Sequence, residues 1–262
     1  MRLTKHHGLG NDFLVTFVDE VPADAPALAT ALCDRRTGIG ADGLIFVTTD
    51  AHGGHAMVLR NSDGSAAELS GNGLRCLGQA IALRNDATEI DEVVQTVVGP
   101  RRIHGSGSEV EMNLTVEMAA ISNGVAILEP FDAPGLPEVV RVGSGDIGNP
   151  HIVVEVPEPD DVDLALAGTH IEATYGPTNV HFVTRGADPD HLRIRVWERG
   201  AGITQACGTG ACVAAHVAHE WGLVGNPTVV EMPGGSATVG LGAMVTLTGP
   251  TVYVGSIEVP RG

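Results

Sequence analysis

Residues 197–212 of the chain are Trp-Glu-Arg-Gly-Ala-Gly-Ile-Thr-Gln-Ala-Cys-Gly-Thr-Gly-Ala-Cys. Alternating apolar residues predict a strand just before this stretch, over 192–197, and the apolar spacing of 211–221 predicts a buried helix after it. Cys207 therefore precedes a helix N-terminus, where backbone N–H groups lack intrahelical partners and favour an anion. The same field lowers the pKa of a thiol, which makes Cys207 a candidate base or nucleophile. The alternative is a small cysteine packed beneath the helix.

The charge and the apolar pattern of the chain exclude several classes of protein. A net charge of −17 over 262 residues argues against nucleic acids and anionic membranes as partners. No apolar stretch approaches the roughly 20 residues that span a bilayer, and the first ten residues lack the apolar run of a signal peptide. We therefore expect a cytoplasmic protein with no membrane or nucleic-acid partner.

The lysine and cysteine content restricts the cofactors. Lys5 is the only lysine, at the start of the first predicted strand, whereas a pyridoxal phosphate enzyme needs a lysine for its Schiff base. We therefore expect chemistry without a cofactor. The cysteines lack paired CxxC spacing, so no metal site is expected. We interpret three of them, Cys33, Cys76 and Cys212, as buried packing residues.

An internal repeat relates the two halves of the chain. Asn61 lies nine residues before Ser70, and Glu198 lies nine residues before Cys207. Ser-Gly-Asn-Gly at 70–73 aligns with Cys-Gly-Thr-Gly in the second half, and each motif opens a predicted helix. Such a registered repeat predicts two similar domains that face each other.

Two glycine–asparagine pairs extend this repeat upstream. Gly10-Asn11 precedes Ser70 by nearly the interval at which Gly148-Asn149 precedes Cys207. Two helix N-termini that converge on a cleft favour a carboxylate ligand, and a residue at each N-terminus approaches that ligand from opposite sides. This arrangement suits removal of a proton from one face of a carbon and its return to the other. The repeat therefore predicts racemisation or epimerisation of an amino acid, with free N–H groups stabilising the developing charge.

The remaining periodicity predicts a mixture of helices and strands. Helices are predicted over 26–36, 74–84 and, as a short segment, 163–167. Residues 1–18 are predicted to form a strand that is interrupted at 8–12, with an alternating run over 13–18. Further strands are predicted over 44–48, 56–60, 92–98, 109–118, 139–142, 152–156, 179–184, 229–231, 236–239, 244–248 and 252–257.

The chain resembles the diaminopimelate epimerase family over nearly its whole length. The motifs that carry the resemblance lie at 8–13, 36–43, 61–73, 148–151 and 198–212. The resemblance implies a pyridoxal-independent, two-base isomerase of lysine and peptidoglycan precursor biosynthesis that interconverts LL- and meso-2,6-diaminopimelate. It implies an α/β (α+β) fold of two pseudo-symmetric domains, each a strand-rich barrel around a central helix, with the active site in the cleft between them. The expected N-terminal domain spans 1–116 plus 250–262, and the C-terminal domain spans 117–249.

The resemblance also assigns roles to individual residues. It implies that Cys207 abstracts a proton, that Ser70 occupies the position of the partner base, and that His151 and Glu198 support these two groups. The substrate-binding positions that it implies are Asn11, Asn61, Gly71, Asn72, Asn149, Asn179, Glu198, Arg199, Gly208 and Thr209. A planar guanidinium such as that of Arg199 also suits a bidentate carboxylate clamp on chemical grounds. A homodimer is the oligomeric state that family members often adopt.

Ser70 is where the chain departs from the family, because that position is a cysteine in the family motif. The pKa of a serine hydroxyl is far above that of a thiol, so Ser70 is no neutral-pH base unaided, although it can donate a hydrogen bond or relay a proton. Four interpretations follow: a natural variant with slow or one-directional epimerisation, an engineered cysteine-to-serine change, a related racemase or dehydratase acting on another substrate, or an amino-acid-binding paralogue without turnover. Gly43 replaces a glutamine of some family members, so a contact there is missing or made by the backbone.

A cysteine hydrolase is an alternative of a different class. It would pair Cys207 with a histidine, but His216 and His219 lie on the following predicted helix, two turns or more from its N-terminus. His181 or His151 would have to serve instead. A burst of acyl-enzyme product would identify a hydrolase.

Overall fold

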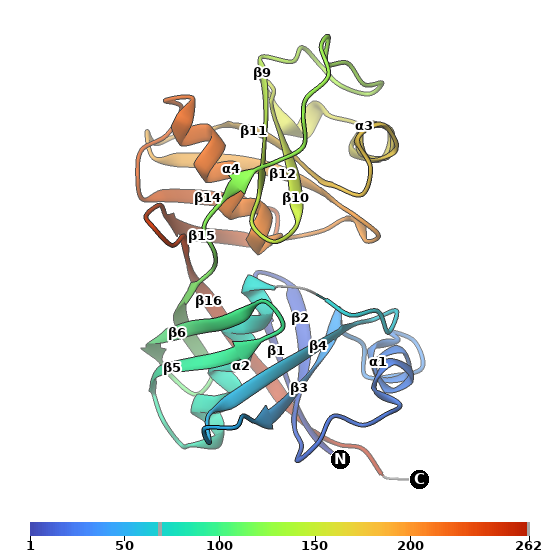
Figure 1. The fold of residues 1–262 in the computed structure, drawn as a ribbon, viewed down its shortest axis with the longest axis vertical. Helices are drawn as coiled ribbons and strands as arrows, with labels where there is room; N and C mark the ends of the chain where they lie inside the picture. Colours follow the sequence, from blue (N-terminus) through green and yellow to red (C-terminus); the bar gives the residue numbers. More distant parts are fainter. Residues whose placement is uncertain (68–69, 261–262) are drawn as a thin grey trace. The chain divides into compact units, whose positions relative to one another are not determined.

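The computed structural model describes residues 1–67 and 70–260 and divides into two compact units (Figure 1). Unit 1 comprises Met1–Glu117 and Thr248–Gly262, and unit 2 comprises Met118–Leu247. Strand β16 (Thr246–Glu258) begins in unit 2 and continues into unit 1. That the two units are independent domains with the predicted bounds stays a prediction.

Unit 1 is a closed barrel of eight strands. Its strands follow the order β1-β2-β3-β4-β5-β6-β7-β16, and β16 pairs with β1 to close the barrel. The strands are β1 (Arg2–Gly8), β2 (Asn11–Phe17), β3 (Gly43–Thr49), β4 (His55–Asn61), β5 (Glu89–Thr96), β6 (Gly99–Gly107), β7 (Glu111–Glu117) and β16. Helix α1 (Ala25–Cys33) packs outside the barrel against β3 and β4.

Helix α2 (Gly71–Arg84) lies inside this barrel. It packs against β1, β2, β5, β6 and β7, and its first twelve residues are all buried. Small residues let the strands approach: a Cβ added at Gly78 would lie 2.7 Å from Ile103 Cγ2. The sequence predicted a helix from about residue 74, and the observed helix begins three residues earlier, directly after Ser70.

Unit 2 repeats the arrangement of unit 1 around helix α4 (Gly208–Glu220). Its strands follow the order β8-β9-β10-β11-β12-β14-β15, and β15 pairs with β16. They are β8 (Ser122–Asn123), β9 (Arg141–Asp146), β10 (Pro150–Glu155), β11 (Asn179–Arg185), β12 (His191–Glu198), β13 (Gly202–Ile203, beside β12), β14 (Thr228–Met232) and β15 (Gly235–Gly240). The sheet wraps around α4, which contacts β9, β10, β11, β12, β14 and β15.

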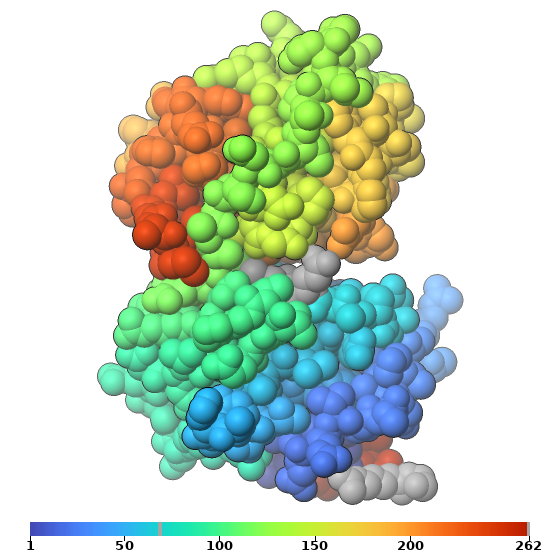
Figure 2. Space-filling view, viewed as in Figure 1, coloured from blue at the N-terminus to red at the C-terminus, as the bar shows by residue number. Residues whose placement is uncertain are grey.

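A second core in unit 2 lies between the sheet and helix α3 (Leu164–Tyr175), which follows the short 3₁₀ helix η1 (Pro159–Asp161). Phe182 and Ile152 are fully buried in this core. Residues 119–140 carry little regular structure and run over the surface of unit 2 (Figure 2), where Val125 and Phe131 pack onto the same core.

The strand pairings confirm the internal repeat. In unit 1, β2 runs parallel to β3 with Phe13 beside Gly43, and in unit 2, β10 runs parallel to β11 with His151 beside Asn179. The next parallel pair is β4 with β5 in unit 1 and β12 with β14 in unit 2. The central helix of each unit connects the strands of that second pair. The predicted fold of two similar barrels, each with a central helix, is confirmed.

The sequence predicted the wrong extent for helix α3 and for the closing strands, and it missed strand β6. Helix α3 has 12 residues rather than the five predicted over 163–167, because polar and apolar residues mix along its exposed face. Strand β6 was not predicted, since Pro100, two arginines and three glycines break its alternation. The two predicted closing strands are one strand, β16, because the fixed φ of Pro250 is compatible with extended backbone. No helix among residues 1–67 and 70–260 is long and apolar enough to cross a bilayer.

Gly168 of α3 lets this helix pack closely against Trp197 of β12, and a substitution at Gly168 tests whether that close contact stabilises unit 2. A Cβ added there would lie 2.3 Å from Cγ of Trp197. We expect Gly168→Ala to lower the free energy of unfolding by about 1–3 kcal/mol, despite the better helix propensity of alanine, because Trp197 must shift. Urea unfolding followed by Trp fluorescence measures the change. Gly242→Ala is the control, because its Cβ meets only Met244 O, at 3.4 Å. A Gly168→Ala protein as stable as the control would contradict this account of the packing.

Candidate active site

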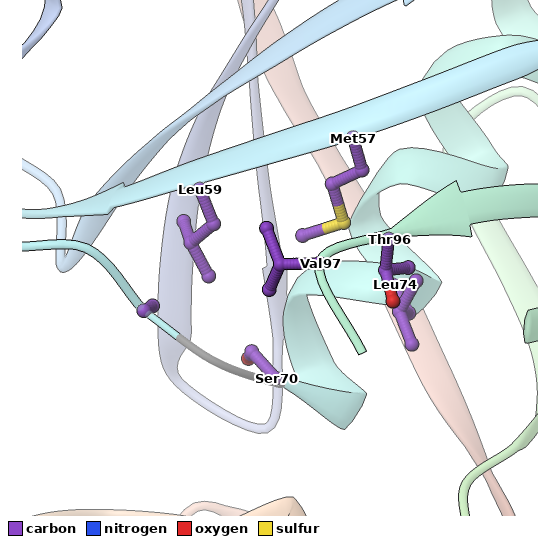
Figure 3. A pocket seen from close by; sticks show the side chains of 7 residues that line it. Met57, Leu59, Ser70, Leu74, Thr96 and Val97 are labelled. Atoms are coloured by element: carbon purple, nitrogen blue, oxygen red, sulfur yellow. The ribbon is translucent and has the colours of Figure 1, made fainter. Parts of the chain in front are cut away.

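Ser70 is the N-cap of α2, the central helix of unit 1. Its backbone is extended (φ −134°, ψ 112°), and its Oγ accepts a hydrogen bond from the Gly73 N–H at 3.0 Å. Figure 3 shows Ser70 at the start of α2, near Met57 and Leu59 of β4. The pocket there has a volume of about 10 Å³ and is otherwise lined by Ala67, Leu74, Thr96 and Val97. The hydroxyl is therefore occupied as a helix cap beside an apolar pocket.

The predicted binding residues Asn11 and Asn72 belong to one hydrogen-bonded chain in unit 1. Asn72, in the first turn of α2, accepts from Arg75 Nη2 at Oδ1 (2.7 Å) and donates from Nδ2 to Asn11 Oδ1 (3.2 Å). Asn11 in turn donates to Asp42 Oδ2 at 2.6 Å. Each amide oxygen already accepts one hydrogen bond, and each amide NH₂ group retains an N–H that can donate to a ligand.

An ion-pair cluster anchors the turn that carries Asn11. Asp12 is contacted by Arg35 Nη2 at 2.7 Å and by Lys5 Nζ at 3.0 Å. Burial raises the pKa of the Asp12 carboxyl, but hydrogen bonds from Arg35 and Lys5 outweigh it, so the pKa is lowered overall. Lys5 is thus committed to a structural ion pair.

Asn61 lies at the end of β4, opposite Gly43 in the sheet register. Its Nδ2 donates to Ser65 Oγ at 3.0 Å. A Cβ at Gly43 would lie 2.9 Å from Arg60 O, so a longer side chain there would require the neighbouring strand to move. Leu59 and Phe13 also lie within 3.2 Å of that Cβ position, so the site of Gly43 has no room for a side chain as the strands stand.

Cys207 is the N-cap of α4, at the position equivalent to Ser70. Its backbone has a similar conformation (φ −123°, ψ 109°), but its side chain makes no capping hydrogen bond. Gly71–Asn72 and Gly208–Thr209 are the first helical residues of α2 and α4, so their backbone N–H groups have no intrahelical acceptor. Each predicted turn thus presents donors at the N-terminus of a buried helix.

The expectation that the α4 N-terminus lowers the pKa of Cys207 was wrong for this structure. Complete burial raises the pKa of the Cys207 thiol well above its ordinary value, and the negative charge of Glu198 raises it further. The Thr209 hydroxyl, 3.6 Å from the sulfur, and the Gly210 N–H oppose this shift but do not reverse it. Cys207 is therefore a protonated thiol when no ligand is bound.

Glu198 lies beside this thiol, at the end of β12. The Glu198 charge acts on the thiol strongly enough to raise its pKa, and the Glu198 carboxylate accepts a hydrogen bond from the Thr204 hydroxyl. The sequence did not identify Thr204, although it lies inside the quoted stretch three residues before Cys207. Cys207, Glu198 and Thr204 together form a thiol–carboxylate pair held in place by a hydroxyl.

His151 lies on β10, which is separated from β12 by β11 in the sheet, and Asn149 directly precedes β10. His151 Nε2 lies 3.0 Å from Asn149 Oδ1, and its Nδ1 lies 2.8 Å from Nε2 of His181 on β11. Both rings are fully buried. Burial lowers the pKa of His181 to about 3 and that of His151 well below its ordinary value, so both rings are neutral at pH 7.

Asn179 connects β10 with the turn after β12. Its Nδ2 donates to Pro150 O at 3.2 Å, and its Oδ1 accepts from the Arg199 N–H at 3.1 Å. The Arg199 backbone is therefore fixed by a buried amide. This places Asn179 as a brace for the segment that carries Glu198 and Arg199.

The other thiols differ from Cys207 in their surroundings. Burial raises the pKa of Cys76 to about 12 and that of Cys33 to about 11, and neither has a neighbouring carboxylate within hydrogen-bonding reach. Cys212 is buried in the middle of α4. Within the described ranges, no group of three or more His, Cys, Asp or Glu side chains is placed to hold a metal ion.

Known proteins resemble this chain in both sequence and structure. The diaminopimelate epimerase family model matches residues 3–120 and 144–254. A diaminopimelate epimerase from Sphingopyxis alaskensis is 37% identical, with 91% of this chain and 88% of that protein covered. One from Pelotomaculum thermopropionicum is 36% identical, with 99% of each covered.

Solved structures with lower identity share the fold. A phenazine biosynthesis protein of the PhzF family from Bacillus anthracis matches with a TM-score of 0.77 at 16% identity, covering 100% of this chain and 99% of that one. A hydroxyproline epimerase from Agrobacterium vitis matches with a TM-score of 0.71 at 18% identity, covering 98% and 91%. With sequence matches of this extent, the chain belongs to the diaminopimelate epimerase family.

Proposed function

We propose that this protein is an isomerase that interconverts LL- and meso-2,6-diaminopimelate. Membership of the diaminopimelate epimerase family supports the substrate. The observation that carries the proposal is the buried Cys207 thiol at the N-terminus of α4, with the Glu198 carboxylate beside it. A thiol that loses its proton to a neighbouring carboxylate in a dry site is a suitable base for a weakly acidic α-hydrogen.

In the proposed reaction, Cys207 transfers its proton to Glu198 and then removes the α-hydrogen of the substrate as a thiolate. Thr204 holds the Glu198 carboxylate in position through its hydroxyl. The first-turn N–H groups of α4, next to Cys207, bind the substrate α-carboxylate, where they also stabilise the charge that develops as the C–H bond breaks. Arg199, Asn11, Asn61, Asn72, Asn149 and Asn179 are the proposed polar contacts to the rest of the substrate or to the residues that hold it.

Ser70 is the proposed acid–base group at the other helix N-terminus. A serine alkoxide is inaccessible near neutral pH, so Ser70 would give its proton to the substrate carbanion only while it receives one from a neighbour. The resemblance implies that His151 supports the bases, but its ring is neutral and both ring nitrogens already have hydrogen-bond partners, so His151 is not the source of this proton. Because Gly73 N–H donates to Ser70 Oγ, the hydroxyl oxygen is held at the helix start with its own proton available for donation.

The composition of the chain supports two further parts of the proposal, namely catalysis without a cofactor and the absence of polyanionic partners. Lys5, the single lysine, is held in an ion pair with Asp12, which supports catalysis without pyridoxal phosphate. We also propose that the protein acts in the cytoplasm, as a homodimer, without a nucleic-acid or membrane partner; the net charge of −17 supports the absence of polyanionic partners.

The role of Ser70 is tested by proton NMR of LL- and meso-diaminopimelate in deuterium oxide. We expect the wild type to incorporate deuterium at the α-carbon and to interconvert the isomers. We expect Ser70→Cys to raise the rate of interconversion by about 10-fold or more, because a thiol is a far better acid and base near neutral pH. Cys207→Ala is the control that removes both activities.

The possible outcomes separate the interpretations of Ser70. Deuterium incorporation from one isomer without inversion would mean that Cys207 acts as a lone base. Turnover only in Ser70→Cys would mean that the site fits the substrate but lacks its second acid–base group. If neither protein exchanges any α-hydrogen, diaminopimelate is not the substrate.

A second test concerns the Glu198 carboxylate. We expect Glu198→Gln to reduce α-hydrogen exchange by about 100-fold or more, because the Cys207 thiol then has no acceptor for its proton. Glu220→Gln makes the same chemical change on the exposed end of α4 and should leave the rate within about 2-fold. A Glu198→Gln protein with the exchange rate of Glu220→Gln would exclude the thiol–carboxylate pair.

A further inference from the structure

The buried histidine pair of unit 2 is not required by the fold. The internal repeat supplies a comparison, because Phe13 of β2 occupies the position of His151, each beside the first residue of the parallel strand that follows. Two residues along that strand, Ile45 of β3 occupies the position of His181. Phe13 and Ile45 are 4% and 0% exposed, as completely buried as the two histidines. The same packing is therefore made in unit 1 by two apolar side chains.

The protons of the pair can be placed from its hydrogen bonds. Asn149 Oδ1 only accepts, so His151 Nε2 must carry a proton and donate it. A neutral His151 then has a bare Nδ1, which accepts from Nε2–H of His181 at 2.8 Å. His181 Nδ1 is consequently an unprotonated acceptor, and among the described residues it has no hydrogen-bond partner. The chain of donors runs in one direction, from His181 through His151 to Asn149.

The position of His181 is fixed by the first turn of α4. A Cβ added at Gly210 would lie 1.9 Å from Cε1 of His181, so the ring packs directly on the helix backbone. Gly210 is three residues after Cys207 and accommodates the ring only because it lacks a side chain. His181 thus lies between the helix turn that carries the thiol and the histidine that orients Asn149.

We propose that His181 is a positioning residue for substrate binding. Its Nε2–H fixes the tautomer of His151, whose Nε2–H in turn holds the Asn149 amide oxygen, leaving the Asn149 NH₂ group free to donate to the ligand. The consequence for the ligand rests on the proposed function, in which Asn149 contacts the substrate. The tautomer and the hydrogen-bond direction do not depend on that function.

Two substitutions at His181 separate the loss of its hydrogen-bond donor to His151 from the loss of its packing in the core. His181→Ile introduces the residue that unit 1 buries at the same position, so the variant is expected to fold, but it removes the donor to His151. His181→Gln retains an N–H₂ donor near the position of Nε2. The double variant His151→Phe/His181→Ile reproduces the unit 1 pair and should be at least as stable as the wild type, since replacing both polar partners by apolar groups costs little. His216→Gln, on the outer face of α4, is the control.

The first readout is ¹⁵N NMR of the imidazole rings in the ligand-free protein, with His151 identified as the signal that is present in His181→Ile and lost in the double variant. We expect His151 to show a protonated Nε2 and a bare Nδ1 in the wild type, in His181→Gln and in His216→Gln. In His181→Ile, Nδ1 has lost its donor and the Asn149 amide can rotate to present its NH₂ group, so we expect this single tautomer to be lost. A wild-type His151 protonated at Nδ1, or a His151 signal unchanged in His181→Ile, would overturn the inference whether or not diaminopimelate is a substrate.

The second readout is steady-state kinetics with diaminopimelate. We expect His181→Ile to raise KM by about 10-fold or more, because Asn149 no longer presents a fixed donor to a charged ligand. We expect His181→Gln to restore KM to within about 3-fold of the wild type. A loss of kcat in both variants with KM unchanged would overturn the role in substrate binding. If the wild type does not turn over diaminopimelate, the proposed function fails, and the NMR result alone decides the assignment of His181.

Discussion

A helix enclosed by a barrel of strands has polar backbone groups that can be satisfied only at its ends. Residues Gly71–Ala82 of α2 and nearly all of α4 are buried. The first-turn N–H groups have no acceptor within the helix, so their hydrogen-bond partners must lie in front of the helix N-terminus. A capping side chain, water or an anionic ligand can supply those partners. The fold therefore creates an anion site at each helix N-terminus before any catalytic residue is considered, and the residues at positions 70 and 207 determine the use of each site.

Burial also controls the chemistry at these sites. The same enclosure that leaves the N–H groups open to a ligand excludes water from Cys207 and raises its pKa. A free thiolate would have to be stabilised by the helix alone, whereas the structure provides Glu198 as an acceptor for the proton. In the proposed mechanism the base is therefore a pair, in which the carboxylate holds the charge until the substrate is bound and then accepts the proton of the thiol.

The sequence predicted the parts of the fold that repeat and the parts of the site that lie in glycine-containing turns. The nine-residue spacing from Asn61 to Ser70 and from Glu198 to Cys207 predicted two similar domains, and the family resemblance supplied the barrel architecture. Both central helices begin three residues before the predicted ranges, at Gly71 and Gly208. The sequence could not predict the direction of the Cys207 pKa shift, because desolvation depends on the strands that surround α4. Nor could it identify His181, since a histidine between Val180 and Phe182 in an apolar strand is indistinguishable from a core residue. Comparison of the two halves strand by strand, which sets His181 against Ile45, is the signal that would have found it.

The hydroxyl of Ser70 has a consequence for the evolution of this chain. As an N-cap that accepts from Gly73, a serine contributes about 0.5–2 kcal/mol to the stability of a helix relative to a residue that cannot cap, and Cys207 at the equivalent position makes no such bond. The two units therefore differ in the use of the N-cap position: Ser70 stabilises its helix through a capping hydrogen bond, whereas Cys207 places a thiol there. In a chain with a marginal total free energy of unfolding, a capping serine at position 70 increases the tolerance of unit 1 to other destabilising mutations.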